Sequence, residues 1–253
     1  MDDLKDKRVL VTGASTGIGA AVAIGFGAAG AAVGVHYNAS RAEAEAVAAT
    51  IRNAGGRAEL LQADVRDGAA TRALIHQAAT ALGGLDVLIN NAGHVIKRTL
   101  LDDLDEALFD ELVDLNMRSV FVATQEAVRL FVKQGHGNII NTTSISARMG
   151  GGPGVALYAG TKGFVSAFTR NVARELAPKG IRCNAVSPGV IETPLHARLT
   201  APTIMETMRQ AVPMGRLGVP EECVGAYLYF ASDRLSGYVT GQVLEVNGGQ
   251  LMV

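Results

Sequence analysis

The sequence has few of the features that mark membrane, secreted or nucleic-acid-binding proteins. Its formal net charge is only −1, so no basic surface for nucleic acid or an anionic membrane is indicated. The opening segment, Met1–Asp6, lacks the apolar run of a signal peptide. Gln125, Glu126 and Arg129 interrupt the most apolar stretch, so it falls short of the roughly 18 residues of a membrane span. We therefore expect a cytoplasmic protein with no nucleic-acid or membrane partner.

Cysteines are scarce, and the histidines are scattered. Cys183 and Cys223 have neither CxxC nor zinc-ligand spacing. They could form one disulfide, but reduced, buried thiols fit a cytosolic protein better. The histidines form no metal-ligand cluster, so we interpret them as ordinary surface residues and expect no metal site. They are His36, His76, His94, His136 and His196.

No internal repeat, low-complexity tract or linker divides the 253 residues. Short β-rich runs alternate with longer segments of helical spacing. Most of the runs are dense in Val, Ile and Leu on both faces, as expected for strands covered on both sides. The runs span residues 8–12, 32–36, 58–62, 85–90, 138–142, 182–186 and 242–246. This alternation predicts one α/β domain over residues 1–253, a doubly wound Rossmann-type fold whose parallel sheet of about seven strands has helices on both faces.

Residues 193–214, after the sixth expected strand, break this rhythm. Leu195 and Leu199 lie one helical turn apart, as do Ile204 and Met208, with prolines between the segments. Two short amphipathic helices are therefore expected. Ligands of such folds bind outside the carboxyl ends of the strands, so we expect this insert to act as a substrate lid. The alternative is a surface flap without function.

A glycine-rich segment, Thr12–Gly19, follows the first expected strand and opens the first helix. Glycines let the backbone turn sharply and approach a pyrophosphate without a Cβ in the way. The helix N-terminus then offers unpaired N–H groups to the phosphate. The GxxxGxG spacing departs from the common GxGxxG fingerprint, and glycines also suit any tight strand–helix turn. Its place in a β-α-β chain nevertheless predicts a dinucleotide site.

Four motifs, in order, resemble those of the short-chain dehydrogenase/reductases. Residues 12–19 resemble TGxxxGIG and residues 90–93 resemble NNAG. Residues 158–162 resemble YxxxK, and 187–189 resemble the element after the sixth strand. The resemblance runs from Lys7 to the carboxyl end. It implies an enzyme, an NAD(P)-dependent oxidoreductase that transfers a hydride between nicotinamide and a carbonyl/secondary-alcohol pair.

Tyr158 and Lys162 have the spacing that such chemistry requires. The alkoxide formed on reduction needs a proton from a group whose pKa lies near the working pH. A free tyrosine titrates at about 10, and a nearby ammonium lowers that pKa. Tyr158 and Lys162 are four residues apart, so they share one face of a helix. Such a pair alone also fits a solvated surface, but its position after the fifth strand favours catalysis.

Ser144 lies just past the fifth strand, where its hydroxyl can donate to the substrate oxygen. By the resemblance it is the catalytic serine. It precedes Tyr158 by 14 positions, one more than is usual in the family, and the glycine-rich residues 150–154 can absorb the extra one. This spacing leaves Ser146 as an alternative.

The resemblance also assigns Asn116 as the fourth catalytic residue. Its backbone carbonyl would hold a water that links Lys162 to solvent. An asparagine is mildly unfavourable inside a helix, and a simple polar interruption is the alternative.

Further residues would bind the cofactor by the same resemblance. Asn91 would meet its adenosine side, and residues 64–65 would bracket the adenine. Ile191 and Thr193 would contact the nicotinamide carboxamide, and Lys162 the ribose hydroxyls. The full predicted cofactor set is Gly13, Ser15, Thr16, Gly17, Ile18, Gly19, Asn38, Ser40, Arg41, Asp64, Val65, Asn91, Ala92, Gly93, Tyr158, Lys162, Pro188, Gly189, Ile191 and Thr193.

NADP(H) is favoured as the cofactor, with NAD(H) also possible. Enzymes that choose NAD place an Asp or Glu at the end of the second strand, where it repels a 2′-phosphate. Here no acidic residue follows His36 before Glu43. Asn38 and Ser40 can donate hydrogen bonds, and Arg41 can supply charge. Residues 40–43 read as a capping box, whose helix N-terminus adds a favourable field for phosphate.

The substrate is less clearly indicated than the chemistry. Residues 180–184, 213–218 and 246–249 are similar to those of 3-oxoacyl-acyl-carrier-protein reductases, and also to bacterial sugar and polyol dehydrogenases. The basic cluster that would dock an acidic carrier protein is thin in residues 133–137, although other basic residues could compensate. These are Arg129, Arg174 and Lys179.

We therefore expect a small-molecule ketone, sugar or polyol, with acyl-carrier-protein reduction as the alternative. A catalytically inactive dinucleotide-binding regulator is a remote alternative, because fold alone does not fix function. The resemblance further implies a homotetramer. Residues 104–134, 157–176 and 250–253 carry apolar groups that such an assembly would cover.

Overall fold

The computed structural model describes residues 2–193 and 202–253. Within these residues, seven strands form one parallel sheet in the order β3-β2-β1-β4-β5-β6-β7. Each lies within two residues of its expected range, so the predicted doubly wound fold is confirmed. The strands are β1 (Arg8–Val11), β2 (Ala32–Tyr37), β3 (Arg57–Gln62), β4 (Val87–Asn90), β5 (Gly137–Thr142), β6 (Ile181–Pro188) and β7 (Val243–Val246).

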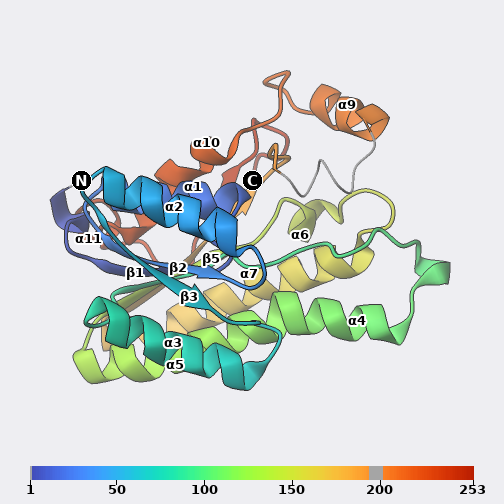
Figure 1. Cartoon of the computed structure of the whole chain (residues 1–253). Coiled ribbons are helices and arrows are strands. Elements are labelled where there is room, and N and C mark those ends of the chain that lie inside the picture. The colour runs from blue at the N-terminus through green and yellow to red at the C-terminus, as the bar shows by residue number, and fades with distance from the viewer. Residues whose placement is uncertain (1, 194–201) are drawn as a thin grey trace.

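Helices cover both faces of this sheet (Figure 1). One layer contains α1 (Gly17–Ala28), α2 (Arg41–Asn53) and α10 (Pro220–Ala231). The other contains α3 (Gly68–Leu82), α5 (Ser119–Gln134) and α7 (Ala156–Leu176). Shorter elements are η1 (Asp2–Leu4), η2 (Leu101–Asp103), α4 (Glu106–Val113), η3 (Asp114–Arg118), α6 (Ser146–Met149), η4 (Ala177–Lys179), α9 (Pro202–Gln210) and α11 (Asp233–Ser236).

Two apolar clusters explain why the strands are rich in Val, Ile and Leu. Successive side chains of a strand point to opposite faces. Val9 and Val11 therefore pack with Phe26 and Tyr227 under the first helical layer, while Leu10 packs under the second. Fully burying one such side chain contributes about 1.5–3 kcal/mol, which ties both layers to the sheet.

The predicted capping box at the start of α2 is wrong. Ser40 is the N-cap residue, but its side chain accepts no hydrogen bond from the helix. A side-chain cap is present instead at α3, where Asp67 accepts from the N–H groups of Ala69 and Ala70. The backbone N–H groups at the start of α2 therefore have no partner in the Ser40 side chain.

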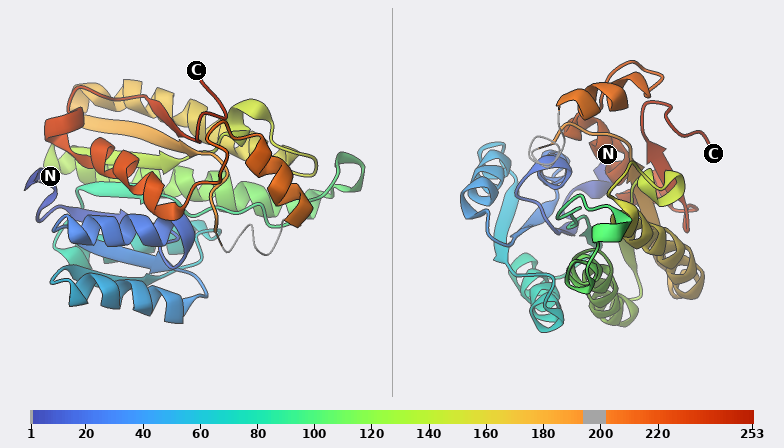
Figure 2. Two further views of the ribbon diagram at one scale, coloured as in Figure 1. Left: turned by 90° about the horizontal axis from the view of Figure 1, so that it is seen from above. Right: turned by 90° about the vertical axis from the view of Figure 1, so that its right-hand side faces the viewer.

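The insert at 193–214 contains one of its two expected helices, α9. The other, with Leu195 and Leu199, falls outside the described residues. Figure 2 shows α9 (orange) beyond the carboxyl ends of the strands. A lid function stays a prediction. Among the helices of residues 2–193 and 202–253, none has the length and apolar character needed to cross a bilayer.

Candidate active site

A cavity of about 640 Å³ opens at the carboxyl ends of the strands. Ligands of doubly wound sheets bind at this edge. All of the predicted site residues line it except Arg41 and Asn116. The structure thus brings the glycine loop, the ends of β2 to β6 and the start of α7 around one space.

The glycine loop depends on its glycines for its shape. Gly13 and Gly17 have φ angles of +62° and +56°, which L side chains rarely adopt. A Cβ on Gly19 would collide with the carbonyl oxygen of Gly13. Helix α1 begins at Gly17, and its N-cap residue Thr16 makes no side-chain cap. The first N–H groups of α1 are thus left for a ligand at the cavity wall.

Asn91 holds this loop against the end of β4. Its side-chain Nδ2 donates to the carbonyl oxygens of Thr12 and Gly13 at 3.0 and 3.1 Å. In return, the Thr12 hydroxyl oxygen accepts from the N–H groups of Asn91 and Ala92 at 2.9 and 3.0 Å. The Asn91 amide is therefore engaged within the protein, and its predicted contact with adenosine stays a prediction.

Tyr158 and Lys162 lie one turn apart on α7, and both line the cavity. Lys162 Nζ lies 5.7 Å from the centroid of the Tyr158 ring and donates to the carbonyl oxygen of Thr142 at 2.8 Å. Lys162 is 3% exposed, and burial lowers its pKa to about 8.

The expected lowering of the Tyr158 pKa is wrong for this structure. Burial raises the pKa of the Tyr158 phenol above its ordinary value, and hydrogen bonding with Ser144 only partly opposes this increase. The ammonium of Lys162 lies over the ring and is directed to Thr142, so lost hydration dominates at the phenol oxygen. Tyr158 is therefore a neutral phenol at neutral pH, the form that can donate a proton.

Ser144 occupies the position expected of the catalytic serine. It is the second residue after β5 and lines the cavity with Tyr158, and its Oγ accepts from the N–H of Ser146 at 3.1 Å. Ser146 begins α6 and does not line this cavity. The longer Ser144–Tyr158 spacing is absorbed in residues 150–154, where three glycines have φ angles between +73° and +79°.

Asn116 lies behind the cavity wall rather than in it. It is fully buried in η3, a π-helical turn between α4 and α5. Its Oδ1 accepts from the His94 N–H at 2.9 Å, and its Nδ2 donates to the His94 carbonyl oxygen at 3.0 Å. A Cβ on Gly93 would lie 2.7 Å from Asn116 Oδ1 and 3.0 Å from Lys162 Nζ. The side chain thus fixes the turn after β4; the predicted role of its carbonyl stays a prediction.

Two of the histidines are not the surface residues that the sequence suggested. His36 is 2% exposed, and His94 is half-buried; both line the cavity. His76 and His136 are exposed as expected, and His196 lies outside the described residues. Because His36 lies inside an expected strand, its burial could have been predicted from the sequence. Within residues 2–193 and 202–253, no three His, Cys, Asp or Glu side chains are grouped as a metal site would require.

Ile96 also lines the cavity, although no motif in the sequence indicated this position. Its φ of +63° is a strained value for a β-branched residue. The Ile96 N–H donates to Nδ1 of His94 at 2.6 Å, which helps to hold this conformation. Strained residues cluster at binding sites, so His94 and Ile96 are candidates for contact with the substrate.

Arg41 does not reach the cavity. Its side chain is 70% exposed and pairs with Glu45 at 2.8 Å, one turn further along α2. Ala39, Glu43 and Arg66 line the cavity here instead. The cysteines match their expectation, since both Cys183 and Cys223 are free and buried.

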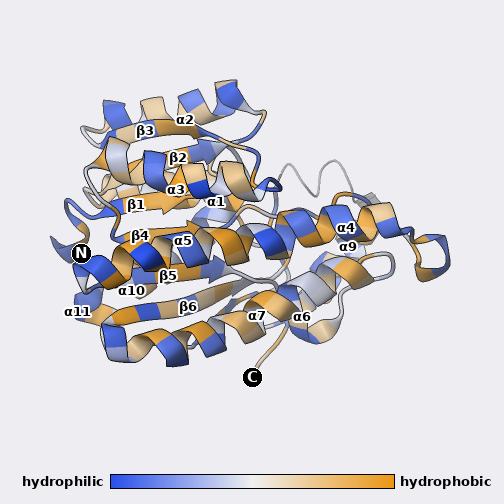
Figure 3. Cartoon of the chain, turned by 90° about the horizontal axis from the view of Figure 1, so that it is seen from below, coloured by the Kyte–Doolittle hydropathy of each residue, from blue (hydrophilic) through white to orange (hydrophobic). Residues whose placement is uncertain are grey.

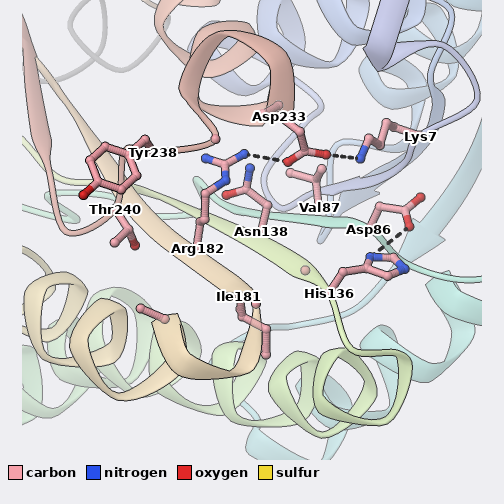
Figure 4. A pocket seen from close by; sticks show the side chains of 15 residues that line it. Lys7, Asp86, Val87, His136, Asn138, Ile181, Arg182, Asp233, Tyr238 and Thr240 are labelled. Carbon is pink, nitrogen blue, oxygen red and sulfur yellow. Dashed lines mark hydrogen bonds and ion pairs between the residues drawn. The ribbon is translucent and has the colours of Figure 1, made fainter.

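A second cavity, of about 800 Å³, opens at the opposite edge of the sheet, among the amino ends of the strands (Figure 4). Its charged side chains pair with one another. Asp233 binds Lys7 at 2.6 Å and Arg182 at 3.0 Å, and Asp86 lies 3.9 Å from His136. It contains none of the predicted catalytic residues, so the smaller cavity is the candidate active site.

Known proteins resemble this chain over its full length. The family model described as enoyl-(acyl carrier protein) reductase matches residues 13–250. The 3-oxoacyl-[acyl-carrier-protein] reductase of Synechocystis sp. is 40% identical over 252 residues, which cover 100% of both chains.

Solved structures also match this chain over nearly its full length, with a similar level of sequence identity. A short-chain type dehydrogenase/reductase from Mycobacterium marinum has a TM-score of 0.93 and 39% identity, and the match covers 98% of this chain and 96% of that one. The NADH-dependent reductase A1-R′, responsible for alginate metabolism, has a TM-score of 0.92 and 37% identity, with 100% of both chains covered.

Proposed function

The chain belongs to the short-chain dehydrogenase/reductase family, and on this premise we propose that it reduces the carbonyl of a small ketone, sugar or polyol-derived substrate. The observation that carries the proposal is the convergence of Ser144, Tyr158 and Lys162 on one cavity with the glycine loop. The proton donor Tyr158, the hydroxyl of Ser144 and the glycine loop that would bind the dinucleotide then surround a space in which a carbonyl can react. The side chain of Asn116 holds the backbone of the lining residue His94 through two hydrogen bonds.

In this proposal Tyr158 is the general acid. The glycine loop would hold the dinucleotide, whose nicotinamide would supply a hydride for the carbonyl carbon. Ser144 donates a hydrogen bond to the carbonyl oxygen, where negative charge develops. Tyr158 transfers its phenolic proton to that oxygen, and the ammonium of Lys162 stabilises the phenolate that remains. Raising the phenol pKa by burial keeps this proton available for reduction.

We further propose a preference for NADP(H) over NAD(H). After β2 the cavity is lined by Asn38, Ala39, Ser40 and Glu43, and the only carboxylate among these four lies in the first turn of α2 rather than at the end of the strand, where it would repel a 2′-phosphate. The start of α2 lacks a side-chain cap and can receive the phosphate. The test is kcat/KM for both cofactors. A wild-type ratio that favours NAD(H) tenfold would overturn this preference.

The variant Arg41→Ala separates charge supplied by Arg41 from the contribution of the backbone. Because Arg41 pairs with Glu45 in the ligand-free chain, it must leave this partner to reach a phosphate. A reduced NADP(H)/NAD(H) ratio in the variant would include Arg41 in the site. An unchanged ratio would remove it and leave the preference to the cavity wall.

A second candidate function is reduction of a 3-oxoacyl group on an acyl carrier protein. The relative from Synechocystis with that name favours it. Against it, Arg129 is already paired with Glu126 at 2.7 Å, and three acidic residues, Asp102, Asp103 and Asp105, lie close together in the chain before α4. These acidic residues oppose the approach of an acidic carrier protein.

A panel of simple ketones, keto sugars and 3-oxoacyl thioesters, each with NADPH and NADH, distinguishes these functions at the nicotinamide absorbance. The proposal expects the highest kcat/KM on a small ketone or sugar. A preference for the thioester that grows when it is attached to the carrier protein would favour the second candidate. Binding of NADPH without turnover of any substrate would indicate a dinucleotide-binding regulator.

We also propose a homotetramer, because several large apolar side chains on α4 and α5 are exposed, Phe109 and Phe121 among them. The proposed location, the cytoplasm, rests on the sequence alone.

A further inference from the structure

His36 is an unusual residue for its position. It lies in β2, a strand whose six residues are all buried, yet it carries a polar ring. A buried polar group costs free energy unless its hydrogen bonds are satisfied. Both ring nitrogens of His36 have partners: one is Gly13, which lines the candidate active site, and the other is Ala63, which directly precedes the lining residue Asp64.

The two hydrogen bonds define one protonation state. The N–H of Gly13 donates to Nδ1 at 3.0 Å. Nε2 lies 3.1 Å from the carbonyl oxygen of Ala63, which can only accept, so Nε2 must carry the hydrogen. The imidazole is therefore neutral. A second proton would sit on Nδ1 and oppose the Gly13 N–H, and burial lowers the pKa of His36 to about 4 although Asp64 favours the charged form.

These contacts join two separate segments of the cavity. Gly13 is the first glycine of the loop after β1, and the carbonyl oxygen of His36 also accepts from the N–H of Ala14 at 2.8 Å. Ala63 directly precedes Asp64 and Val65, which line the cavity after β3. His36 thus spans the loops on both sides of its own strand.

We propose that His36 is a positioning residue for dinucleotide binding, whose neutral ring cross-links the glycine loop to the loop after β3. This inference rests on the proposed cofactor. It acts through the backbone of Gly13, whose left-handed conformation shapes the pyrophosphate cradle. Without the acceptor at Nδ1, the Gly13 N–H loses its partner and the cradle loses a fixed point.

The test compares two substitutions in the full-length protein. His36→Phe keeps a planar ring and removes both hydrogen bonds. His36→Asn places its δ oxygen where Nδ1 lies, so it can still accept from Gly13. We expect His36→Phe to raise the Kd for NADPH by about tenfold, the usual scale for one unpaired buried group. We expect kcat at saturating NADPH to change little, and His36→Asn to recover most of the affinity.

Asn184 provides a matched control in β6, a strand on the other side of β1 from β2 in the sheet. It is fully buried in β6 and also bridges two backbone groups, donating to Val239 O at 2.9 Å and accepting from Gln242 N at 3.0 Å. Asn184→Leu should lower thermal stability without changing the Kd for NADPH. An equal loss of affinity in Asn184→Leu would mean that destabilisation alone explains the His36 variant, and would overturn the inference.

Wild-type protein supplies an independent measurement if His36→Phe does not fold. In NMR spectra the ring signal of His36, assigned by its loss in His36→Asn, should keep the chemical shift of a neutral ring from pH 7.5 to pH 5.5. Titration of that signal near the ordinary histidine value would overturn the inference. Unchanged Kd in a folded His36→Phe would overturn it alone, whereas failure of the wild type to bind NADPH or NADH would overturn the proposed function as well.

Discussion

Lys162 is a cation held where charge is disfavoured. It is 3% exposed, and its hydrogen bond to Thr142 replaces only part of its lost hydration. Its pKa of about 8 therefore lies well below the value of an unfolded chain. Between these two values the unfolded chain binds more protons than the folded one, so the free energy of unfolding rises as the pH rises through that window. The proposed catalytic group costs stability at neutral pH.

Lys162→Met should therefore abolish activity and stabilise the fold. Each pKa unit corresponds to about 1.4 kcal/mol, and loss of the hydrogen bond to Thr142 offsets about 1 kcal/mol. We expect the free energy of unfolding at pH 7 to increase by about 2 kcal/mol in urea denaturation. The gain should shrink at pH 10, where the wild-type lysine is neutral in the fold. A variant less stable than wild type at pH 7 would contradict this account.

For individual residues, the sequence allowed the site residues to be predicted better than the contacts that they make. Ser144, Tyr158 and Lys162 could be predicted because their spacing and chemistry are local to one strand end and one helix. The bonds of Asn116 to His94 and of His36 to Gly13 join residues more than 20 positions apart. No local pattern encodes such contacts. The Tyr158 pKa was misjudged for a related reason, because burial depends on the surrounding fold.

Among the elements, the loop of residues 150–154 directly affects the geometry of the site. It connects α6 to α7 and therefore sets where Tyr158 lies relative to Ser144. Gly151 has a φ of +73°, and a Cβ there would lie 2.5 Å from Cγ2 of Val155, the N-cap residue of α7. A side chain at Gly151 must displace the start of the helix that carries Tyr158.

Gly151→Ala should lower both stability and activity, whereas Gly152→Ala should change neither. The left-handed backbone costs roughly 1–2 kcal/mol for an alanine, and the contact with Val155 adds to it. At Gly152 the backbone is not left-handed, and a Cβ would meet nothing within 4 Å. Thermal melting and kcat of the two variants test this difference. Equal behaviour of the two alanines would show that the loop does not position Tyr158.

Strand positions were predicted closely because the strands between the edges β3 and β7 are buried on both faces and so have continuous apolar runs. Caps and irregular turns were predicted less well. Ser40 has the residue type expected in a capping box, but its side chain makes no cap. The π-helical turn η3 lies between α4 and α5, and Asn116 in this turn bonds to His94 in another part of the chain. These features are decided by neighbouring elements rather than by local sequence.

For the whole molecule, the exposed apolar side chains require an explanation. Phe109, Phe121 and Val132 are 42–48% exposed on α4 and α5, and Phe121 packs against Phe168 of α7. Figure 3 shows apolar residues along α5 and α7, on the layer that faces the viewer. Large exposed apolar patches usually mark an interface, and closed symmetric assemblies are the common result.

We expect a tetramer in solution. Light scattering should give a mass of about 105 kDa, four times that of the 26.3 kDa chain. Phe121→Asp should reduce this mass, because it places a charge in the apolar patch. Leu101→Asp, at an 80% exposed position in the separate turn η2, is the matched control and should leave the mass unchanged. A monomer mass for the wild type at micromolar concentration would contradict the assembly.

The central claim is that Tyr158 supplies the proton for carbonyl reduction, and Tyr158→Phe tests it most directly. The variant keeps the ring and loses only the hydroxyl that would transfer the proton. With the best substrate of the panel, kcat should fall about 100-fold or more, the usual scale for loss of an acid/base group, while the Kd for NADPH stays within about threefold of wild type. A folded Tyr158→Phe protein that reduces this substrate at the wild-type rate would contradict the account.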